Sequence, residues 1–433
     1  MQYDGDMFKR YVQKRLERYV VKYFAKHPEV TLIAVVGSVG KTSTKRAIAD
    51  VLSYRFRVRM HEGNHNTEMA APLAILGIEY PSNIRSPLAW LAVFRAAKLR
   101  IKQPTDVDVI IQELGTDHPG EIAAFGKYLT PYISLVTAIA PEHMEFFGTI
   151  EEVAKEEMAV GAYSKFVLIN RDDVDAQFAE LEQNPNFSTY GTSGVAEYRF
   201  EQQEFSVESG YIGSLIAVDH SPFGVTIKVV GEHSLRPVIG AVAVAMRLGM
   251  TEQDILQGLA LVRPVPGRMN ILRGITGTTI IDDTYNSSPA AAEAALRTLY
   301  LFDAAPQRIA ILGDMRELGE SSQREHEKLG EMCDPGLLSW IVAVGPDCEK
   351  YLAPVARRKG CQVHVARNAI EAGEFVRSVT QEGAVILAKG SQNTIFLEEA
   401  VKILCDITEH SKLVRQSVDW QQKKNDYFAQ FQK

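Results

Sequence analysis

The chain has 433 residues, of which 46% are hydrophobic and 23% are charged, and its formal net charge is −7 at pH 7. This acidic balance argues against a general nucleic-acid binder, and four cysteines without a Cys-x-x-Cys pair argue against a zinc site or a disulfide framework. Because no apolar run approaches the roughly 18–20 residues of a bilayer span and no signal peptide is recognisable, we expect a cytoplasmic protein of two or three domains.

Residues 1–30 are predicted to form an amphipathic helical extension, with seven Lys or Arg residues against four Asp or Glu. The apolar positions recur at steps of three and four residues: Phe8, Val12, Leu16, Tyr19, Val20, Tyr23 and Phe24. Two interpretations stay open. The helix either packs on the protein body, or it contacts a membrane surface through residues 8–26.

From residue 31 onwards, short apolar strands alternate with helices, which predicts a parallel sheet covered on both faces. We expect strands at 31–36, 107–112, 133–138 and 165–170, and helices at 41–54 and 149–163. The segment at about 190–230 is rich in β-branched and aromatic residues and predicts an antiparallel insertion, followed by a helix at 237–248. Residues 31–267 would form one domain.

Two prolines and a glycine at 262–268 indicate a linker, after which the alternation restarts in a second doubly wound domain at 268–412. We expect strands at 278–283, 308–313, 340–344, 362–366 and 384–388, and helices at 289–302, 321–333, 367–380 and 394–408. A polar and aromatic tail occupies 413–433. The predicted fold class is α/β throughout.

A glycine-rich turn follows the first strand and opens a helix, which is the setting of a phosphate-binding loop. The loop residues are Gly37, Ser38, Val39, Gly40, Lys41, Thr42 and Ser43. Backbone N–H groups would surround the phosphates, Lys41 would contact the β and γ phosphates, and the Thr42 hydroxyl would bind Mg²⁺. Because Val35 stands where the general motif has its first glycine, the match is to a shortened form, GxxGKT. The alternative is a structural turn.

Further motifs resemble the ATP-dependent Mur ligases, and within them the MurF type. They are GNHNTE at 63–68, ELG at 113–115, APEH at 140–143, DDTYN at 282–286, GDMRELG at 313–319 and KGS at 389–391. The resemblance implies a central P-loop ATPase domain and a C-terminal Rossmann-like domain. It also implies an N-terminal UDP-binding domain, which we expect to be missing because only residues 1–30 precede the first strand.

The resemblance implies an ATP- and Mg²⁺-dependent ligation. A substrate carboxylate attacks the γ-phosphate of ATP, and an amine then displaces phosphate from the acyl phosphate. In the MurF type, D-alanyl-D-alanine is joined to a UDP-muramoyl tripeptide. We therefore expect small-molecule substrates, no nucleic acid, and a monomer.

The resemblance also assigns metal ligands. Glu113 would bind Mg²⁺ together with Thr42, and His143 would bind a second Mg²⁺. MurF-type enzymes carry a carbamylated lysine on the next helix, and that position aligns with Glu157 here. A glutamate would supply the carboxylate directly, without CO₂. Lys155 is the rival if the register is shifted.

Other assignments concern the nucleotide and the substrates. Arg268 would reach the phosphates, Asp282 or Asp283 the ribose, and Asn286 the edge of the nucleotide. Lys389 and Ser391 would face the reacting centre. The proposed substrate contacts are Asn64, Asn66 and Thr67 in the first domain, and Asp314 and Glu317, which suit an ammonium group, in the second.

Two alternatives remain. One is a Mur-ligase relative that acts on a lipid-linked or non-wall carboxylate, which fits the missing domain and the basic helix. The other is a nucleotide-binding partner subunit without ligase activity. Its basis is that Ser234, Pro237 and Gln392 stand where the family has asparagine, asparagine and arginine.

Overall fold

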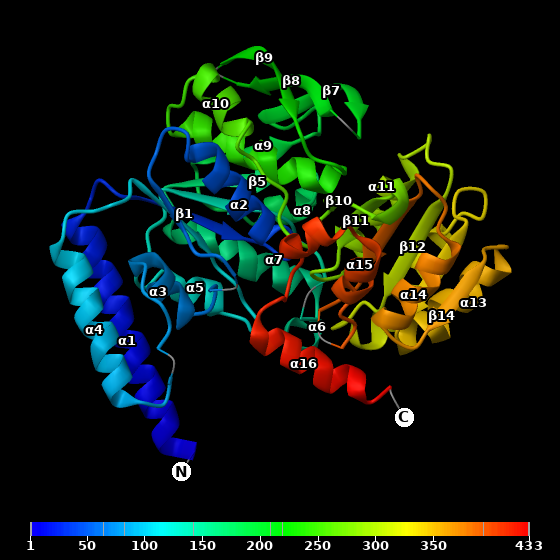
Figure 1. Ribbon diagram of the computed structural model, residues 1–433. Coiled ribbons are helices and arrows are strands. Elements are labelled where there is room, and N and C mark those ends of the chain that lie inside the picture. The colour runs from blue at the N-terminus through cyan, green and yellow to red at the C-terminus, as the bar shows by residue number, and fades with distance from the viewer. Residues whose placement is uncertain are drawn as a thin grey trace. The chain divides into compact units, whose positions relative to one another are not determined.

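The computed structural model describes residues 2–63, 65–81, 83–141, 143–207, 209–218, 220–392 and 394–431. The chain divides into two compact units (Figure 1). The first consists of Met1–Lys228 and Leu235–Arg263, and the second of Val229–Ser234 and Pro264–Lys433. In the part of the chain that is described, no helix is both long and apolar enough to cross a membrane.

The first unit is built on a nine-stranded sheet with the order β2-β3-β1-β4-β5-β6-β7-β8-β9. Its strands are β1 (Thr31–Val36), β2 (Val58–Met60), β3 (Val109–Glu113), β4 (Ile133–Val136), β5 (Phe166–Asn170), β6 (Phe187–Gly191), β7 (Tyr198–Ser206), β8 (Gly210–Ala217) and β9 (His220–Ile227). Pairing is parallel from β2 to β7 and antiparallel from β7 to β9. The expected antiparallel segment therefore continues the main sheet.

The burial of these strands follows their sequence. β3 is buried at every position, as expected for a strand that is covered on both faces, whereas buried and exposed residues alternate along β9. The helices of this unit are α1 (Gln2–Lys26), α2 (Lys41–Leu52), α3 (Ala70–Leu76), α4 (Pro87–Lys102), α5 (Glu121–Phe125), α6 (Met144–Phe147), α7 (Ile150–Met158), α8 (Ala176–Ala179), α9 (Glu232–Arg247) and α10 (Glu252–Leu259).

Two predicted helices of this unit differ in extent, and another helix was missed. The helix expected at 149–163 is α7 followed by a 3₁₀ segment at Ala159–Tyr163. Helix α9 starts at Glu232, ahead of Pro237, so this proline lies inside the helix. Helix α4 was not predicted. It begins at a Ser86 cap, whose side chain accepts a hydrogen bond from the Ala89 N–H.

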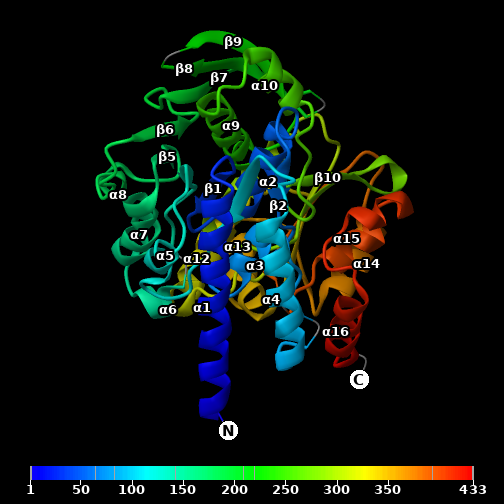
Figure 2. The same ribbon diagram turned by 90° about the vertical axis from the view of Figure 1, so that its left-hand side faces the viewer.

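Helix α1 packs on the first unit through its inner face, as the first interpretation of residues 1–30 predicts. Val12, Leu16 and Val20 are buried, and the Tyr19 and Phe94 ring centroids lie 6.0 Å apart. Figure 2 shows α1 and α4 side by side along their length.

The second unit has a six-stranded sheet with the order β10-β11-β15-β12-β13-β14, in which only the β10–β11 pair is antiparallel. Its strands are β10 (Asn270–Arg273), β11 (Thr279–Asp283), β12 (Arg308–Gly313), β13 (Trp340–Val344), β14 (Val363–Ala366) and β15 (Val385–Lys389). Its helices are α11 (Pro289–Tyr300), α12 (Ser322–Met332), α13 (Ala353–Arg358), α14 (Ala369–Val379), α15 (Glu398–Leu404) and α16 (Val418–Ala429). The predicted α/β class is confirmed in both units.

The polar tail of the sequence is an ordered part of the second unit. Phe428 of α16 is buried, with its ring 6.2 Å from that of Phe396. Arg415 makes two hydrogen bonds of 2.8 Å to Glu398 and donates to the carbonyl oxygens of Thr284 (2.7 Å) and Tyr285 (3.0 Å). The tail thus holds the loop that follows β11.

Candidate active site

The phosphate loop joins β1 to α2, and its shape requires glycine. Gly37 has a φ of +121°, and a Cβ atom there would lie 2.4 Å from the Thr137 Oγ1 atom. Ser38 donates its N–H to the Ala138 carbonyl at 2.9 Å, so the segment after β4 supports the loop. Gly40 precedes α2 without a side-chain cap. Because glycine has no side chain, it leaves room for an anion beside the N–H groups at the start of the helix, as a phosphate site requires.

Lys41 lies on the loop, where its ammonium group donates to the carbonyl oxygens of Gly37 and, at 3.3 Å, Ser38. Thr42 places its hydroxyl 3.2 Å from Glu113 Oε2. Glu113 is only 3% exposed and ends β3, next to β1 in the sheet. A hydroxyl and a carboxylate at this edge form a set of hard oxygen donors, which fits Mg²⁺.

Lys45 is part of this cluster and was missed in the sequence. Its Nζ lies 3.1 Å from the same Glu113 oxygen, and both side chains are buried. It also donates to the Gly63 carbonyl at 3.2 Å. The signal was available, because Lys45 is four residues after Lys41 and therefore close to it on the surface of α2.

The loop at 63–68 lies over the end of β3. The Asn66 carbonyl accepts from Gly115 N–H at 2.9 Å, and the Asn66 amide lies 3.4 Å from Glu113 Oε1. Thr67 is exposed, and its carbonyl accepts from the first residues of α3. Asn64 lies outside the described residues. The predicted substrate residue Asn66 is thus next to the predicted metal ligand Glu113.

Glu157 reaches the phosphate loop, whereas Lys155 does not. The Glu157 carboxylate is 1% exposed and accepts the Gly37 N–H at 2.8 Å. The Lys155 side chain is 59% exposed and pairs with Glu152 at 2.5 Å. This geometry favours the Glu157 register of the alignment.

His143 and Glu156 complete the polar groups of this region. His143 adopts a left-handed backbone (φ +48°), and its Nε2 lies 3.3 Å from Asp117 Oδ1. Glu156, which was not predicted, accepts the N–H groups of Gly120 and Ile122 at 2.6 Å each. Glu156 therefore holds the start of α5, which is a structural role.

In the second unit, an ion pair joins two adjacent strand ends. Asp283 and Lys389 are register partners on β11 and β15, and Lys389 Nζ lies 2.9 Å from Asp283 Oδ2. Lys389 also donates to the Asn286 carbonyl at 2.6 Å. Asp282 is fully buried, where its Oδ1 accepts the Thr284 hydroxyl at 2.6 Å, and burial raises the pKa of Asp282 to about 6.

The other residues that the resemblance assigns to the nucleotide are Arg268 and Asn286. Asn286 is exposed, and Arg268 holds its guanidinium 4.4 Å from the Tyr285 ring centroid. Among the described residues, the buried Arg268 Nε has no hydrogen-bond partner. Ser391 is buried; its hydroxyl donates to the Ser287 carbonyl at 3.1 Å and accepts the Arg316 N–H at 2.9 Å.

Comparisons with known proteins agree with these two units. Residues 35–245 match the family described as Mur ligase middle domain, and residues 267–392 match the Mur ligase, glutamate ligase domain. The chain belongs to the Mur ligase family. The resemblance in the motifs is therefore confirmed, together with the P-loop and Rossmann-like character of the two units.

Several curated and solved relatives of this Mur ligase are of the MurF type. It is 26% identical over 387 residues to a Bacillus subtilis protein named UDP-N-acetylmuramoyl-tripeptide–D-alanyl-D-alanine ligase, and the matched part covers 87% of this chain and 76% of the relative. The Escherichia coli protein of the same name is 25% identical over 377 residues, and the matched part covers 86% of this chain and 76% of the relative.

Two solved structures show the same fold. The crystal structure of MurF from *Acinetobacter baumannii* has a TM-score of 0.72 at 23% identity and covers 89% of this chain and 79% of its own. MurF ligase from *Thermotoga maritima* in complex with ADP also has a TM-score of 0.72, at 24% identity, with 90% and 83% covered.

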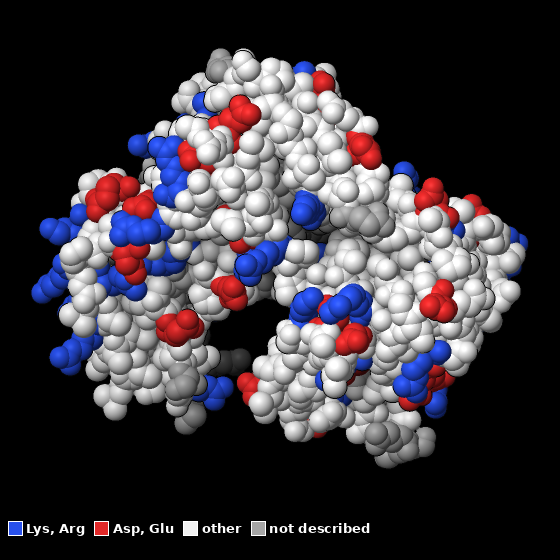
Figure 3. Space-filling view, turned by 45° about the horizontal axis from the view of Figure 1, so that its top comes forward, with Lys and Arg blue, Asp and Glu red and all other residues white. Residues whose placement is uncertain are grey.

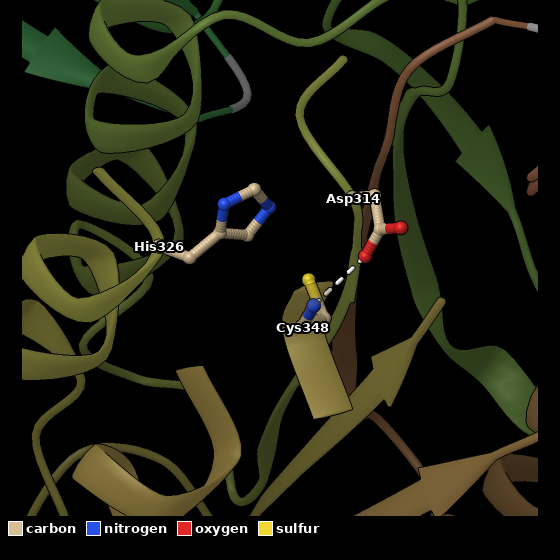
Figure 4. Close-up of side chains that lie close together, drawn as sticks. All are labelled: Asp314, His326 and Cys348. Carbon is tan, nitrogen blue, oxygen red and sulfur yellow. Dashed lines mark hydrogen bonds between the residues drawn. The ribbon is translucent and has the colours of Figure 1, made fainter. Parts of the chain in front are cut away.

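Asp314, one of the two residues assigned to the ammonium group, has its Oδ2 3.6 Å from the Arg316 guanidinium. Its carboxylate is fully buried and accepts the Cys348 N–H at 2.8 Å (Figure 4). Asp314 thus holds a turn. Of the two residues assigned to the ammonium group, Glu317 is the exposed one.

Asp314, His326 and Cys348, shown in Figure 4, are residue types that can bind a metal ion. Their hydrogen bonds to the backbone indicate a structural role instead. His326 Nε2 accepts the Met315 N–H at 3.0 Å, so Nδ1 carries the proton and donates to the Ser322 carbonyl at 2.8 Å. Both ring nitrogens are occupied. Burial raises the pKa of the Cys348 thiol well above its usual value, so this sulfur stays protonated.

Proposed function

We propose that this chain is an ATP-dependent ligase that forms an amide bond through an acyl phosphate, adding D-alanyl-D-alanine to a UDP-N-acetylmuramoyl tripeptide during peptidoglycan precursor synthesis. The observation that carries the proposal is the contact of Thr42 with Glu113 beside the phosphate loop, in a chain of the Mur ligase family. The names of its curated relatives support the substrates. The enzyme acts as a cytoplasmic monomer.

The phosphate loop binds the triphosphate of ATP. The N–H groups at the start of α2 and the Lys41 ammonium group face the β and γ phosphates, where negative charge is concentrated. Lys41 stabilises the charge on the transferring phosphoryl group as the substrate carboxylate attacks it. No nucleophile of the enzyme is needed, because the substrate carboxylate and the incoming amine are themselves the nucleophiles.

Thr42 and Glu113 would hold one Mg²⁺, and His143 with Glu157 would hold a second. When bound, these ions neutralise the oxygens of the phosphates and of the acyl phosphate. Glu157 would replace the carbamylated lysine of MurF-type enzymes. This role is supported by the buried position of its carboxylate on the Gly37 N–H.

The second unit carries further residues that the resemblance to Mur ligases assigns to the reaction. Asp283 holds Lys389 at the end of β15, from where the Lys389 ammonium group would stabilise charge at the acyl phosphate. Arg268 would bind phosphate through its guanidinium group, whose buried Nε lacks a hydrogen-bond partner among the described residues. Asn286 would border the nucleotide. Asp283 is a better candidate for the ribose than Asp282, because Asp282 is fully buried and accepts the Thr284 hydroxyl, whereas Asp283 is 6% exposed.

Substrate contacts are proposed for Asn66 and Thr67 in the first unit and for Glu317 in the second. Ser391 would help to shape the dipeptide side through its bonds to Ser287 and Arg316.

The experiment is ATP-dependent phosphate release with D-alanyl-D-alanine and UDP-N-acetylmuramoyl tripeptide, together with the product mass. We expect release that requires both substrates and a product heavier than the acid by the dipeptide less water. The Lys41→Ala variant, purified in parallel, controls for contaminating ATPases. ATP binding without a product of this mass would refute the proposed substrates.

A lipid-linked carboxylate is the second candidate for the acid substrate. The loop at 63–68, which carries the proposed substrate contacts Asn66 and Thr67, is named the substrate loop. The observation that favours a lipid-linked acid is the 2.9 Å hydrogen bond from Gln13 of the basic helix α1 to Glu68 of this loop. Product formation from a lipid-linked muramoyl peptide, but not from the UDP-linked one, would select this candidate.

A further inference from the structure

Helices α1 and α4 present an exposed surface that is basic and partly apolar, which we name the basic helix pair. The two helices lie parallel in contact: Tyr19 packs against Phe94, and His27 Nε2 lies 3.2 Å from the Ile101 carbonyl. Their inner faces thus pack on the rest of the first unit. The outer faces remain exposed.

The outer face of α1 carries a row of cations. The exposed basic residues are Lys9, Arg10, Lys14, Arg18, Lys22 and Lys26. From Met7 onwards, the acidic residue of this helix is Glu17, which is half-buried and accepts a hydrogen bond from Gln13. Among the described residues of α1, the exposed charged side chains are therefore all basic.

Helix α4 adds leucines to this charge. Leu88, Leu91 and Leu99 are 77%, 57% and 52% exposed, and their spacing places them on one stripe of the helix. Arg95, Lys98 and Lys102 follow the same stripe, and α4 contains no acidic residue. Figure 3 shows Lys and Arg side chains projecting along the left-hand edge, the side on which Figure 1 places α1 and α4.

We propose that the basic helix pair docks on the surface of an anionic lipid bilayer. Rows of Lys and Arg are attracted to anionic headgroups, and exposed leucines among them can enter the boundary between headgroups and acyl chains. The chain as a whole has a net charge of −7, so this positive surface is a local feature that is opposite in sign to the net charge of the protein. Neither described helix could span the bilayer, so the pair would lie on it.

Docking would also position the substrate loop. Gln13 lies in the middle of α1 and hydrogen-bonds to Glu68, the last residue of the substrate loop at 63–68. A bilayer under α1 would therefore hold this loop close to the membrane surface. The docking itself does not depend on the reaction, because it is measured without substrates.

The test is flotation of the full chain with vesicles of phosphatidylcholine mixed with phosphatidylglycerol, and with vesicles of phosphatidylcholine alone. The triple variant Lys14→Gln, Arg18→Gln, Lys22→Gln removes one row of charge from α1. The matched control Arg324→Gln, Arg358→Gln, Arg377→Gln removes three exposed charges from the second unit. Thermal melts verify that each variant is folded.

We expect the wild-type chain and the control to float with the anionic vesicles only. The α1 triple variant should lose about a hundredfold in partition coefficient. Wild-type binding should also fall steeply as salt shortens the screening length from ~10 Å at 0.1 M to ~3 Å at 1 M. Equal binding by both triple variants, or no flotation of the wild-type chain, would overturn the proposal, as would binding to a polyanion such as heparin without binding to anionic vesicles.

Discussion

The substitution Glu157→Gln separates the two candidates for the carboxylate at the second metal position. Glutamine keeps an oxygen that can accept the Gly37 N–H, now 2.8 Å from Glu157, so the phosphate loop should keep its shape while the charge is lost. Removing one preorganised electrostatic group from an active site costs about 10²–10³ in turnover, or roughly 3–4 kcal/mol. We expect a fall of this size in kcat for Glu157→Gln.

Lys155→Ala is the matched control. The Lys155 side chain is 59% exposed and its partner Glu152 is 48% exposed, so their pair contributes little to stability. Its turnover should stay within about twofold of the wild-type value, because the exposed Lys155 pairs with Glu152 and does not contact the phosphate loop.

The assay is ATP-dependent product formation with and without added bicarbonate. A carbamylated Lys155 would make the wild-type rate depend on bicarbonate, whereas Glu157 would not. Glu157→Lys should recover part of the lost rate when bicarbonate is present. A large loss in Lys155→Ala with little loss in Glu157→Gln would refute the reasoning.

Three further predictions concern single charged residues. Lys41→Ala should lower turnover by at least about a hundredfold; a variant with more than about a tenth of the rate would contradict its role. Lys45→Met leaves the buried Glu113 carboxylate without its cation and should lower the free energy of unfolding by about 3–5 kcal/mol, measured by urea denaturation, with excess Mg²⁺ restoring part of the loss. The pKa of Asp282 is about 6 in the folded protein against 3.8 in the unfolded chain, so the folded state binds this proton more tightly. Loss of the proton as pH rises from about 4 to 6 should therefore lower the free energy of unfolding by up to about 3 kcal/mol. Asp282→Asn should therefore raise the Tm at pH 7.5 more than at pH 4.5, and an unchanged pH dependence would contradict this.

The periodicity of hydrophobic residues predicted most of the strands and helices. Buried parallel strands such as β1 and β3 are short apolar runs, and the strand–turn–helix order around Gly37 made the phosphate loop recognisable. Helix α4 was harder to predict, because its exposed leucines blur the contrast between its two faces. The tail helix α16 is mostly polar, and its burial through Phe428 depends on a partner that is distant in sequence.

The site was predictable in its residue types and less so in its contacts. Strand ends indicated that Glu113, Asp283 and Lys389 would be polar groups at sheet edges. Whether a carboxylate faces solvent or a backbone N–H depends on tertiary packing, and a motif does not contain that information. Asp314 shows the limit, since its burial against Cys348 could not be inferred from the sequence.

The bonds of Arg415 have a consequence for how the second unit folds during synthesis. Its side chain binds the Thr284 carbonyl across 131 residues of chain, and Lys389 binds the Asn286 carbonyl across 103. The loop after β11 therefore lacks both supports while these later residues remain to be translated. We expect a nascent chain to hold the first unit's phosphate loop in native form well before the loop after β11 in the second unit, and the two units to mature in that order.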